Sequence, residues 1–395
     1  MSSKVPLDLM PINEEGPSLI RGSYPDSFGI PATDFKQPTI TTESIPENFD
    51  ANDPVQKFAG IGLEITSAVI GNVISHPCIV IRRQCQVNRK ATKYHLSPFT
   101  LIPVLMRLHS RQGVSCLWKG CSGIFILRGC STVLETFLAE ATPFPREVSS
   151  SSSLKQLSQH LLLKLISFGI LTPFYCASLV ETVQSDIASE KPGVLDCLKE
   201  GVCRLLKIGT PRSTRLLPMW QLVGPTALFG LSTYVFSSLI QSVLHWFRNL
   251  KLYNTQKKTL FEYQSSQSST ANYLEDLSIQ YFSSFIASIL MYPAETMLHR
   301  LYLQGTRTII DDLDSGTSVL PVISTYEGFV DCFHTIVNEE GASGLYKGFG
   351  ALLLEYAMQA LLLKAAQMAF REMESLFKTA KKPISEATET TQIMS

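Results

Sequence analysis

The sequence predicts an all-α membrane protein with six transmembrane helices arranged as three related repeats. Three observations lead to this fold class. Hydrophobic residues make up 45% of the 395 residues and charged residues only 17%, whereas a soluble domain carries about 25% charged residues. Six largely apolar stretches are each long enough to supply the about 20 helical residues that cross a bilayer. Three prolines, Pro77, Pro173 and Pro293, lie at the ends of the first, third and fifth stretches.

The six stretches lie near residues 58–80, 120–141, 157–181, 216–244, 274–297 and 348–370. The fourth is the clearest, because it contains no charged residue. The second contains Arg128 and Glu135, and the sixth contains Glu355 and Lys364. A charge at bilayer depth is costly unless it faces protein or water, so we expect these four side chains to line an interior cavity. Snorkelling of Lys364 to the membrane surface is the alternative for that residue.

Polar segments flank and separate the stretches. We expect disordered tails over residues 1–54 and 378–395 and a polar linker over 254–272, because such segments have too little apolar surface to form a core. The repeats then occupy residues 55–148, 149–253 and 273–377. Residues 1–56 contain three basic and nine acidic residues, which is not the Arg-rich composition of a cleaved mitochondrial presequence.

Several classes of function are disfavoured. The 34 basic and 34 acidic residues leave no excess of positive charge for nucleic-acid binding. The nine cysteines form no C-x-x-C pair and no paired histidine motif accompanies them, so we expect reduced thiols in an intracellular protein and no metal site. The chain has no G-x-S-x-G, P-loop, H-E-x-x-H or Rossmann fingerprint, so we expect neither an enzyme nor a cofactor.

The third repeat carries the most complete motif. Pro293 and Glu295 are followed by Arg300, and further on come Glu340, Gly341, Tyr346, Lys347 and Gly348. This segment resembles the mitochondrial carrier family, whose signature is P-x-[DE]-x-x-[KR]-x-[RQ] and later [DE]-G-x4-[WYF]-[KR]-G. A proline kinks a helix, and glycines allow turns and close approach of backbones, which suits helices that converge at one membrane face.

The other two repeats are less complete. The first retains Pro77, Arg82, Gln84, Gly113, Trp118, Lys119 and Gly120. Its two acidic positions hold Ile79 and Gln112 instead. The second retains Pro173 but has Tyr175 and Ser178 in the charged positions, and its second half is not recognisable.

The resemblance implies six tilted helices and three short surface helices around a central cavity, with a ring of three ion pairs that closes one gate of a transporter. Here the three acidic positions of the ring hold Ile79, Tyr175 and Glu295, and the three basic positions hold Arg82, Ser178 and Leu298. Only Arg82 and Glu295 can form a residual gate pair. A water-exposed pair contributes about 0–1 kcal/mol, so we expect a weak gate.

Five segments resemble the divergent outer-membrane branch of this family: residues 76–88, 94–100, 143–148, 173–185 and 298–311. That resemblance implies a multi-pass protein of the mitochondrial outer membrane with a role in fission–fusion balance, cristae maintenance and lipid exchange. The implied partners are the lipid bilayer, the dynamin-like GTPases of fusion and the cristae-organising complex. Six spans place both termini on one side, which we expect to be the cytosolic side.

Three functions remain open. The first is a non-transporting adaptor, the second a solute transporter of the carrier type with weakened gates, and the third a lipid-handling protein. A basic cluster that follows the first stretch contains Arg82, Arg83, Arg89, Lys90 and Lys93. It either contacts anionic lipid or sets the membrane topology.

Overall fold

The computed structural model describes residues 54–146, 148, 153–186, 193, 195–206, 216–258, 269–314, 318–369 and 372. The expected tails lie outside these residues, apart from Pro54. Within the described residues the chain is mostly helical, as predicted.

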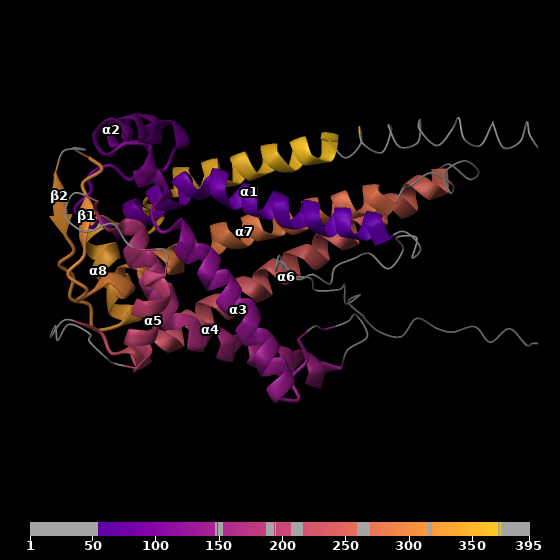
Figure 1. The fold of residues 1–395 in the computed structure, drawn as a ribbon, viewed down its shortest axis with the longest axis horizontal. Helices are drawn as coiled ribbons and strands as arrows, with labels where there is room; N and C mark the ends of the chain where they lie inside the picture. The colour runs from indigo at the N-terminus through magenta and orange to yellow at the C-terminus, as the bar shows by residue number, and fades with distance from the viewer. Residues whose placement is uncertain are drawn as a thin grey trace, which may run out of the picture. The chain divides into compact units, whose positions relative to one another are not determined.

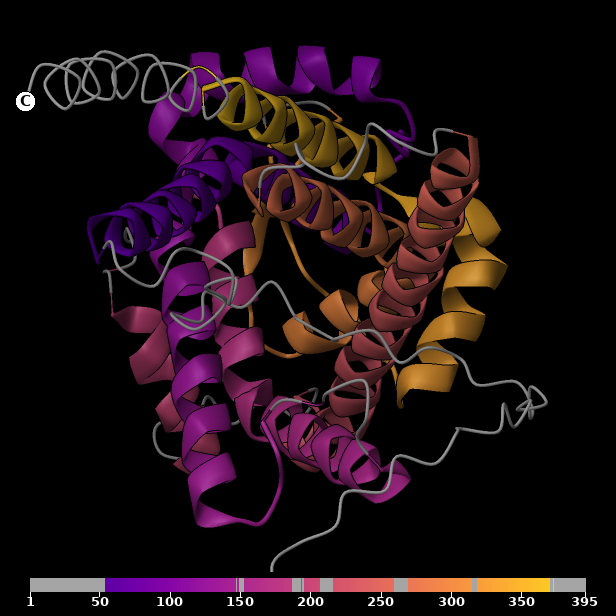
Figure 2. The same cartoon turned by 90° about the vertical axis from the view of Figure 1, so that its right-hand side faces the viewer.

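Long helices follow all six predicted stretches. They are α1 (Pro54–Val87), α3 (Cys121–Ala141), α4 (Leu154–Val183), α6 (Met219–Lys258), α7 (Ser269–Leu303) and a helix over residues 349–369. The short helices are α2 (Ile102–Gln112), α5 (Asp196–Leu206) and α8 (Phe329–Glu340). Figure 1 shows the short helices gathered at one end of the long ones, which we name the capped end. Figure 2, viewed along the bundle, shows the long helices in a ring.

The three motif prolines lie inside helices rather than at their ends. Helices α1, α4 and α7 end at Val87, Val183 and Leu303, in each case ten residues after the proline. Each helix therefore continues past its motif proline to the capped end. A proline removes a single backbone donor, and the turns beyond it are buried at the capped end, where packing stabilises them.

The second half of the motif has the same backbone conformation in the first and third repeats. Helices α2 and α8 are each followed by a glycine with positive φ, Gly113 (φ 80°) and Gly341 (φ 75°). A 3₁₀ helix comes next and ends at the motif aromatic, at Val114–Trp118 in one repeat and at Ala342–Tyr346 in the other. Positive φ with ψ near 180° is a backbone conformation that essentially only glycine adopts, which is why a glycine occupies this position of the motif.

Two further segments differ from expectation. Residues 254–258 and 269–272 of the expected linker belong to helices α6 and α7, because neither segment contains a proline or a glycine that would end a helix. Residues 259–268 of that linker lie outside the described residues. The segment 305–325, which we name the insertion, adds strands β1 (Ile309–Asp311) and β2 (Val319–Pro321) to an otherwise helical chain. The strands are antiparallel, and Ile310 pairs with Leu320.

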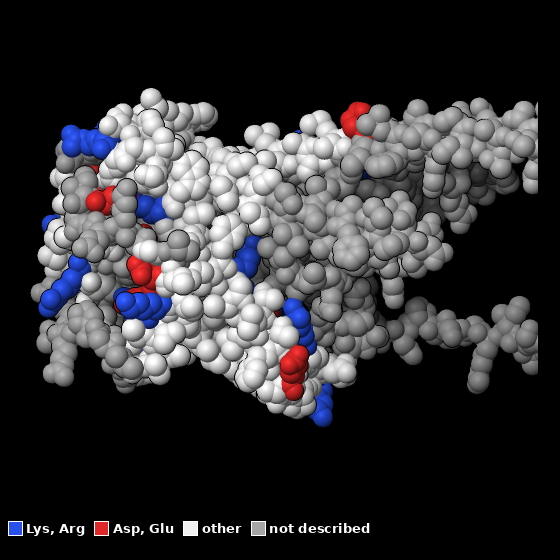
Figure 3. Space-filling view, in the orientation of Figure 1, with Lys and Arg blue, Asp and Glu red and all other residues white. Residues whose placement is uncertain are grey.

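Among the residues that the structure describes, four helical segments are long and apolar enough to cross a membrane: Val114–Ala141, Leu154–Val183, Met219–Lys251 and Ala342–Ala369. Their outward surfaces expose large apolar side chains such as Phe137, Leu228 and Leu361. Figure 3 shows a broad, largely uncharged band along the long helices, with most of the charges on this face gathered at the capped end. Helices α1 and α7 are not in this set, although both form over predicted stretches.

The core is concentrated at the capped end. One apolar cluster joins the last turns of α4 and α7 to α8, and it includes Leu179, Leu301 and Ile336. A second joins the end of α1 to α2 and includes Ile81, Leu101 and Leu108. The ends of α1, α4 and α7 are therefore held by packing at the place where the motif residues lie.

Candidate functional site

The candidate site is the capped end, where the turns after the motif prolines meet. The structure brings Arg82 and Glu295 together, with 3.5 Å between Nη2 and Oε1. The same Nη2 lies 3.6 Å from Oε2 of Glu355, on the helix over residues 349–369. The side chains of Arg82, Glu295 and Glu355 are 12%, 18% and 10% exposed, so one arginine serves two largely buried carboxylates.

The second position of the ring, between α1 and α4, has hydrogen bonds instead of an ion pair. Arg83, next to the motif arginine, donates from Nη1 to Oγ1 of Thr182 over 2.8 Å and approaches the carbonyl of Ser178 at 3.5 Å. Ile79, in the acidic position, is buried. Arg83 therefore provides a polar contact between helices that have lost their charged pair.

The third position, between α4 and α7, is apolar. Leu298 is 1% exposed and belongs to the same core cluster as Cys176 and Leu179. Tyr175 packs against that cluster. The ring thus consists of one shared ion pair, one set of hydrogen bonds and one apolar contact.

In the third repeat, the charged residues of the motif form a buried triad. Glu340 accepts two hydrogen bonds from the guanidinium of Arg300, one of them 2.9 Å long, and its Oε2 lies 2.6 Å from Nζ of Lys347. The three side chains are 7%, 2% and 1% exposed. Burial alone would raise the pKa of Glu340, but the hydrogen bonds and charges of Arg300 and Lys347 outweigh it and hold the pKa below its usual value. Lys347 also donates to the carbonyls of Asn88 and Arg89, just beyond α1.

In the first repeat the lysine has an acidic partner from elsewhere in the chain. Nζ of Lys119 lies 3.3 Å from Oδ2 of Asp311, on strand β1, and 3.5 Å from Oδ1 of Asp186. Gln112, in the position of the motif acid, donates to Oδ1 of Asp311 over 2.8 Å and accepts from Lys119 over 3.3 Å. Asp311 therefore provides the negative charge that the motif has lost. Lys119 also donates to the carbonyl of Gln184, just beyond α4.

Two motif glycines fit closely against the neighbouring helix. A Cβ on Gly120 would lie 2.8 Å from Oγ1 of Thr182 on α4, and a Cβ on Gly348 would lie 2.7 Å from Cβ of Cys85 on α1. Both glycines also have positive φ. They allow the chain after Lys119 and Lys347 to lie directly against the ends of α4 and α1.

Two other motif residues of the first repeat have different roles. Trp118 donates from Nε1 to the carbonyl of Val73 over 2.8 Å. Gln84 is fully buried, and its amide atoms have no hydrogen-bond partner among the described residues. Within the described chain, no three His, Cys, Asp or Glu residues lie close enough to hold a metal.

The four charges expected to line a cavity do not form one cluster. Glu135 pairs with Lys164 on α4 at 2.8 Å, with both side chains 5% exposed or less, and Glu355 pairs with Arg82. Lys364 is exposed and Arg128 is half-buried.

Sequence reasoning did not single out Lys164 as the partner of Glu135, because Lys164 comes just before the uncharged part of the stretch near residues 157–181. A signal was available in the spacing of His160 and Lys164, which places both on one face of α4. His160 contacts the hydroxyl of Tyr234 at 2.9 Å, and Lys164 lies 5.6 Å from the centre of the same ring.

Comparisons with known proteins identify the family. The family described as "Mitochondrial carrier protein" matches residues 269–375. A Gallus gallus protein named "Mitochondrial outer membrane protein SLC25A46" is 45% identical over 318 residues, which cover 80% of this chain and 78% of that protein. The Homo sapiens protein of the same name is 41% identical over 356 residues, with 88% and 84% covered. The Xenopus laevis "Solute carrier family 25 member 46-B" is 44% identical over 320 residues, with 81% and 77% covered. This chain therefore belongs to the mitochondrial carrier family, in the branch of solute carrier family 25 member 46.

Proposed function

We propose that this protein is a carrier-fold adaptor of the mitochondrial outer membrane that does not exchange solutes. The relatives quoted above that carry the name "Mitochondrial outer membrane protein" support the location. As an adaptor it links the outer membrane to fission–fusion balance, cristae maintenance and lipid exchange. Its proposed partners are dynamin-like GTPases and the cristae-organising complex, and it has no catalytic role.

The proposed architecture is six spans in three repeats, over residues 55–148, 149–253 and 273–377. The equal distance from each motif proline to the end of its helix supports this repeat. The matching glycines of the first and third repeats support it as well. Six spans place both termini on the same side of the membrane, and we propose the cytosolic side.

The observation that carries the proposal is how the insertion is joined to the capped end. Asp311 binds Lys119 of the first repeat, and Ser185 at the end of α4 donates its N–H to the carbonyl of Ile309 over 2.8 Å. Asp314 accepts hydrogen bonds of 2.6 and 2.8 Å from Thr92. The insertion thus joins the ends of α1 and α4 to the repeat that contains α7.

Alternating access would require α1, α4 and α7 to separate at the capped end in every cycle. Separation would break the buried contacts of Asp311 and expose the apolar contact between α4 and α7. A working exchanger needs a gate whose closed and open forms differ by little free energy, since both must be populated. The capped end therefore suits a bundle that remains closed.

Transport by purified protein in liposomes tests the proposal. Liposomes are loaded with nucleotides, carboxylates, amino acids or phosphate, and uptake of the labelled counterpart is followed against liposomes that contain a working carrier. We expect uptake no faster than in empty liposomes. Saturable exchange of any solute would contradict the adaptor.

The location and orientation have a separate test. Protease is added to intact mitochondria, and antibodies against the first and last residues follow the two tails. We expect both tails to be digested while the outer membrane is intact. Protection of both tails until the outer membrane is ruptured would contradict the proposed placement.

A carrier-type transporter with weakened gates is the alternative. Arg128 favours it, because this half-buried cation lies within a candidate span and forms no ion pair with the described residues. Such a cation is a suitable contact for an anionic solute. If the liposomes show uptake, Arg128→Gln should abolish it, whereas Lys364→Gln at the exposed position should leave it unchanged.

A further inference from the structure

A pocket of about 550 Å³ lies at the capped end, and Arg82, Glu295 and Glu355 of the ring are not among the residues that line it. Its walls are the chain just after α1, the last turns of α7, the end of α8, and strand β2 with the residues that follow it. Pockets for small ligands typically have volumes of about 300–1,000 Å³. The volume is therefore sufficient for a small organic molecule.

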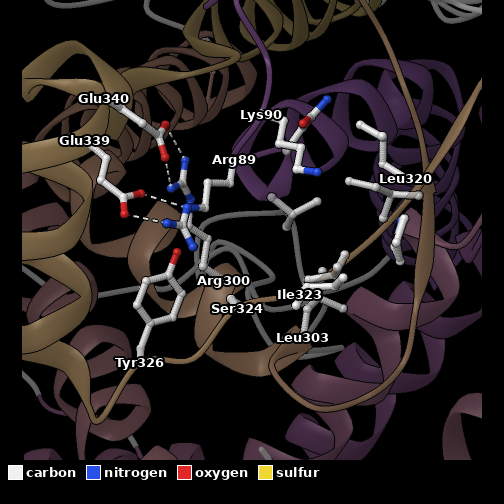
Figure 4. Close-up of a pocket in the computed structure, with 15 residues that line it drawn as sticks. Arg89, Lys90, Arg300, Leu303, Leu320, Ile323, Ser324, Tyr326, Glu339 and Glu340 are labelled. Atoms are coloured by element: carbon white, nitrogen blue, oxygen red, sulfur yellow. Dashed lines mark hydrogen bonds and ion pairs between the residues drawn. The ribbon is translucent and has the colours of Figure 1, made fainter.

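The two sides of the pocket differ in chemistry. Figure 4 shows Arg89 and Arg300 with Glu339 and Glu340 on one side, and Leu303, Leu320 and Ile323 on the other. The apolar side also contains Val87, Ile310 and Val322. A ligand that fits both sides has one polar and one apolar end.

The charged residues that line the pocket leave one positive charge for a ligand, on Lys90. Arg89 is paired with Glu339, and Arg300 with Glu340. Lys90 also lines the pocket, and among the described residues it forms no ion pair. A single anionic group is the complement of this arrangement.

Two buried polar atoms of the lining are unsatisfied. The Nδ2 of Asn88 and the Oγ of Ser324 have no hydrogen-bond partner among the described residues, although the side chains are only 1% and 6% exposed. Leaving buried donors unpaired is costly, and native proteins rarely do so. An amide N–H and a hydroxyl both donate to an acceptor oxygen, so these two atoms suit a head group that carries such oxygens, and Lys90 favours a negative charge on it.

We propose that this pocket binds a single-chain amphiphile whose head is a carboxylate or a phosphate monoester. The head accepts hydrogen bonds from Asn88 and Ser324 and pairs with Lys90. The chain lies along Leu303, Leu320 and Ile323. The proposal does not depend on whether the protein moves solutes, because none of the ring residues Arg82, Glu295 and Glu355 lines the pocket.

The test uses the full chain in nanodiscs of neutral phosphatidylcholine. A decanoate that carries a diazirine on its chain is photo-crosslinked to the protein, and the labelled peptides are identified by mass spectrometry. We expect labelling of residues 319–326. Decanoate or decyl phosphate should compete at least about tenfold better than decanol or inorganic phosphate, because only the first two combine an anionic head with an apolar chain. The better of the two anions identifies the head group.

Three variants complete the test. Lys90→Gln and Ser324→Ala should each weaken competition by about tenfold, because each removes a contact to a charged group. Lys93→Gln is the matched control, since Lys93 is an exposed cation nearby that does not line the pocket. The proposal is overturned if decanol competes as well as decanoate, if labelling falls outside the pocket, or if Lys90→Gln and Lys93→Gln behave alike.

Discussion

The first and third repeats each contain a buried motif lysine, and they supply its carboxylate partner in two different ways. In both repeats the lysine follows the motif aromatic and donates to a backbone carbonyl just beyond a long helix of another repeat. Lys119 does so at the end of α4, and Lys347 at the end of α1. The third repeat supplies the balancing carboxylate from its own motif, Glu340, whereas the first takes it from Asp311, 192 residues further along the chain. A lost motif residue therefore does not mean a lost interaction, and the donor of the charge determines which segments are joined.

The largest loss of stability is expected at Glu340, because its carboxylate pairs with two cations. Glu340→Ala leaves Arg300 and Lys347 buried without their partner, and breaking a buried pair costs about 3–5 kcal/mol. Thermal unfolding in detergent measures it. Glu339→Ala is the control, because its pair with Arg89 is exposed and is worth about 0–1 kcal/mol. Equal losses in the two variants would contradict the role assigned to the triad.

A smaller effect is expected in the first repeat. Asp311→Asn removes one carboxylate from Lys119 but leaves Asp186 nearby, so we expect a loss of about 1–3 kcal/mol. The additional change Gln112→Glu should recover most of that loss, since it returns a carboxylate to the motif position. Thermal unfolding of the two variants measures both effects. If the double variant is less stable than the single one, Asp311 is not the substitute for the missing motif acid.

The shift at Glu340 predicts a dependence on pH. Its pKa is lowered in the folded state, so its contribution to stability is fully present above the unfolded value of about 4.3 and is lost as the pH falls through the lower folded value. The difference in unfolding temperature between the wild type and Glu340→Gln should therefore narrow below about pH 4. A difference that widens on acidification would mean that the shift has the opposite sign.

The smallest effect is expected in the ring. Glu295→Gln should cost about 1 kcal/mol, because Arg82 retains Glu355 and the glutamine fills the same space and can still accept a hydrogen bond. Removal of both carboxylates should cost more than the sum of the single changes, because only the double variant leaves Arg82 without a carboxylate partner. The unfolding temperatures of the wild type, the two single variants and the double variant together form a double-mutant cycle that measures this coupling. Additive losses would show that the two acids act separately.

Much of the fold could be predicted from the sequence. Apolar stretches of the right length located the long helices, and the family resemblance implied the three short helices. The strands of the insertion could not be predicted, because each has only three residues and an alternating pattern needs more. Helices α1, α4 and α7 extend beyond the predicted stretches, since a proline weakens a helix without ending it where the next turns are buried.

The site was predictable only where the motif supplies its own partner. The positions of Arg300, Glu340 and Lys347 in the motif are enough to suggest that they belong together. Asp311 could not be assigned, because nothing local relates a short strand to a lysine in another repeat. Nor could the sharing of Arg82 by two acids be seen, since it depends on how the helix over residues 349–369 packs against α1.

The most direct test of a permanently closed capped end is a disulfide between the insertion and α4. Gln184 and Ile310 form an isolated antiparallel bridge, so Gln184→Cys with Ile310→Cys has suitable geometry. The measurement is restoration of mitochondrial shape in cells that lack the protein, with the crosslinked fraction determined by mass spectrometry. A bundle that stays closed during its work predicts full restoration by the crosslinked protein. Loss of restoration that returns when the disulfide is reduced would contradict it.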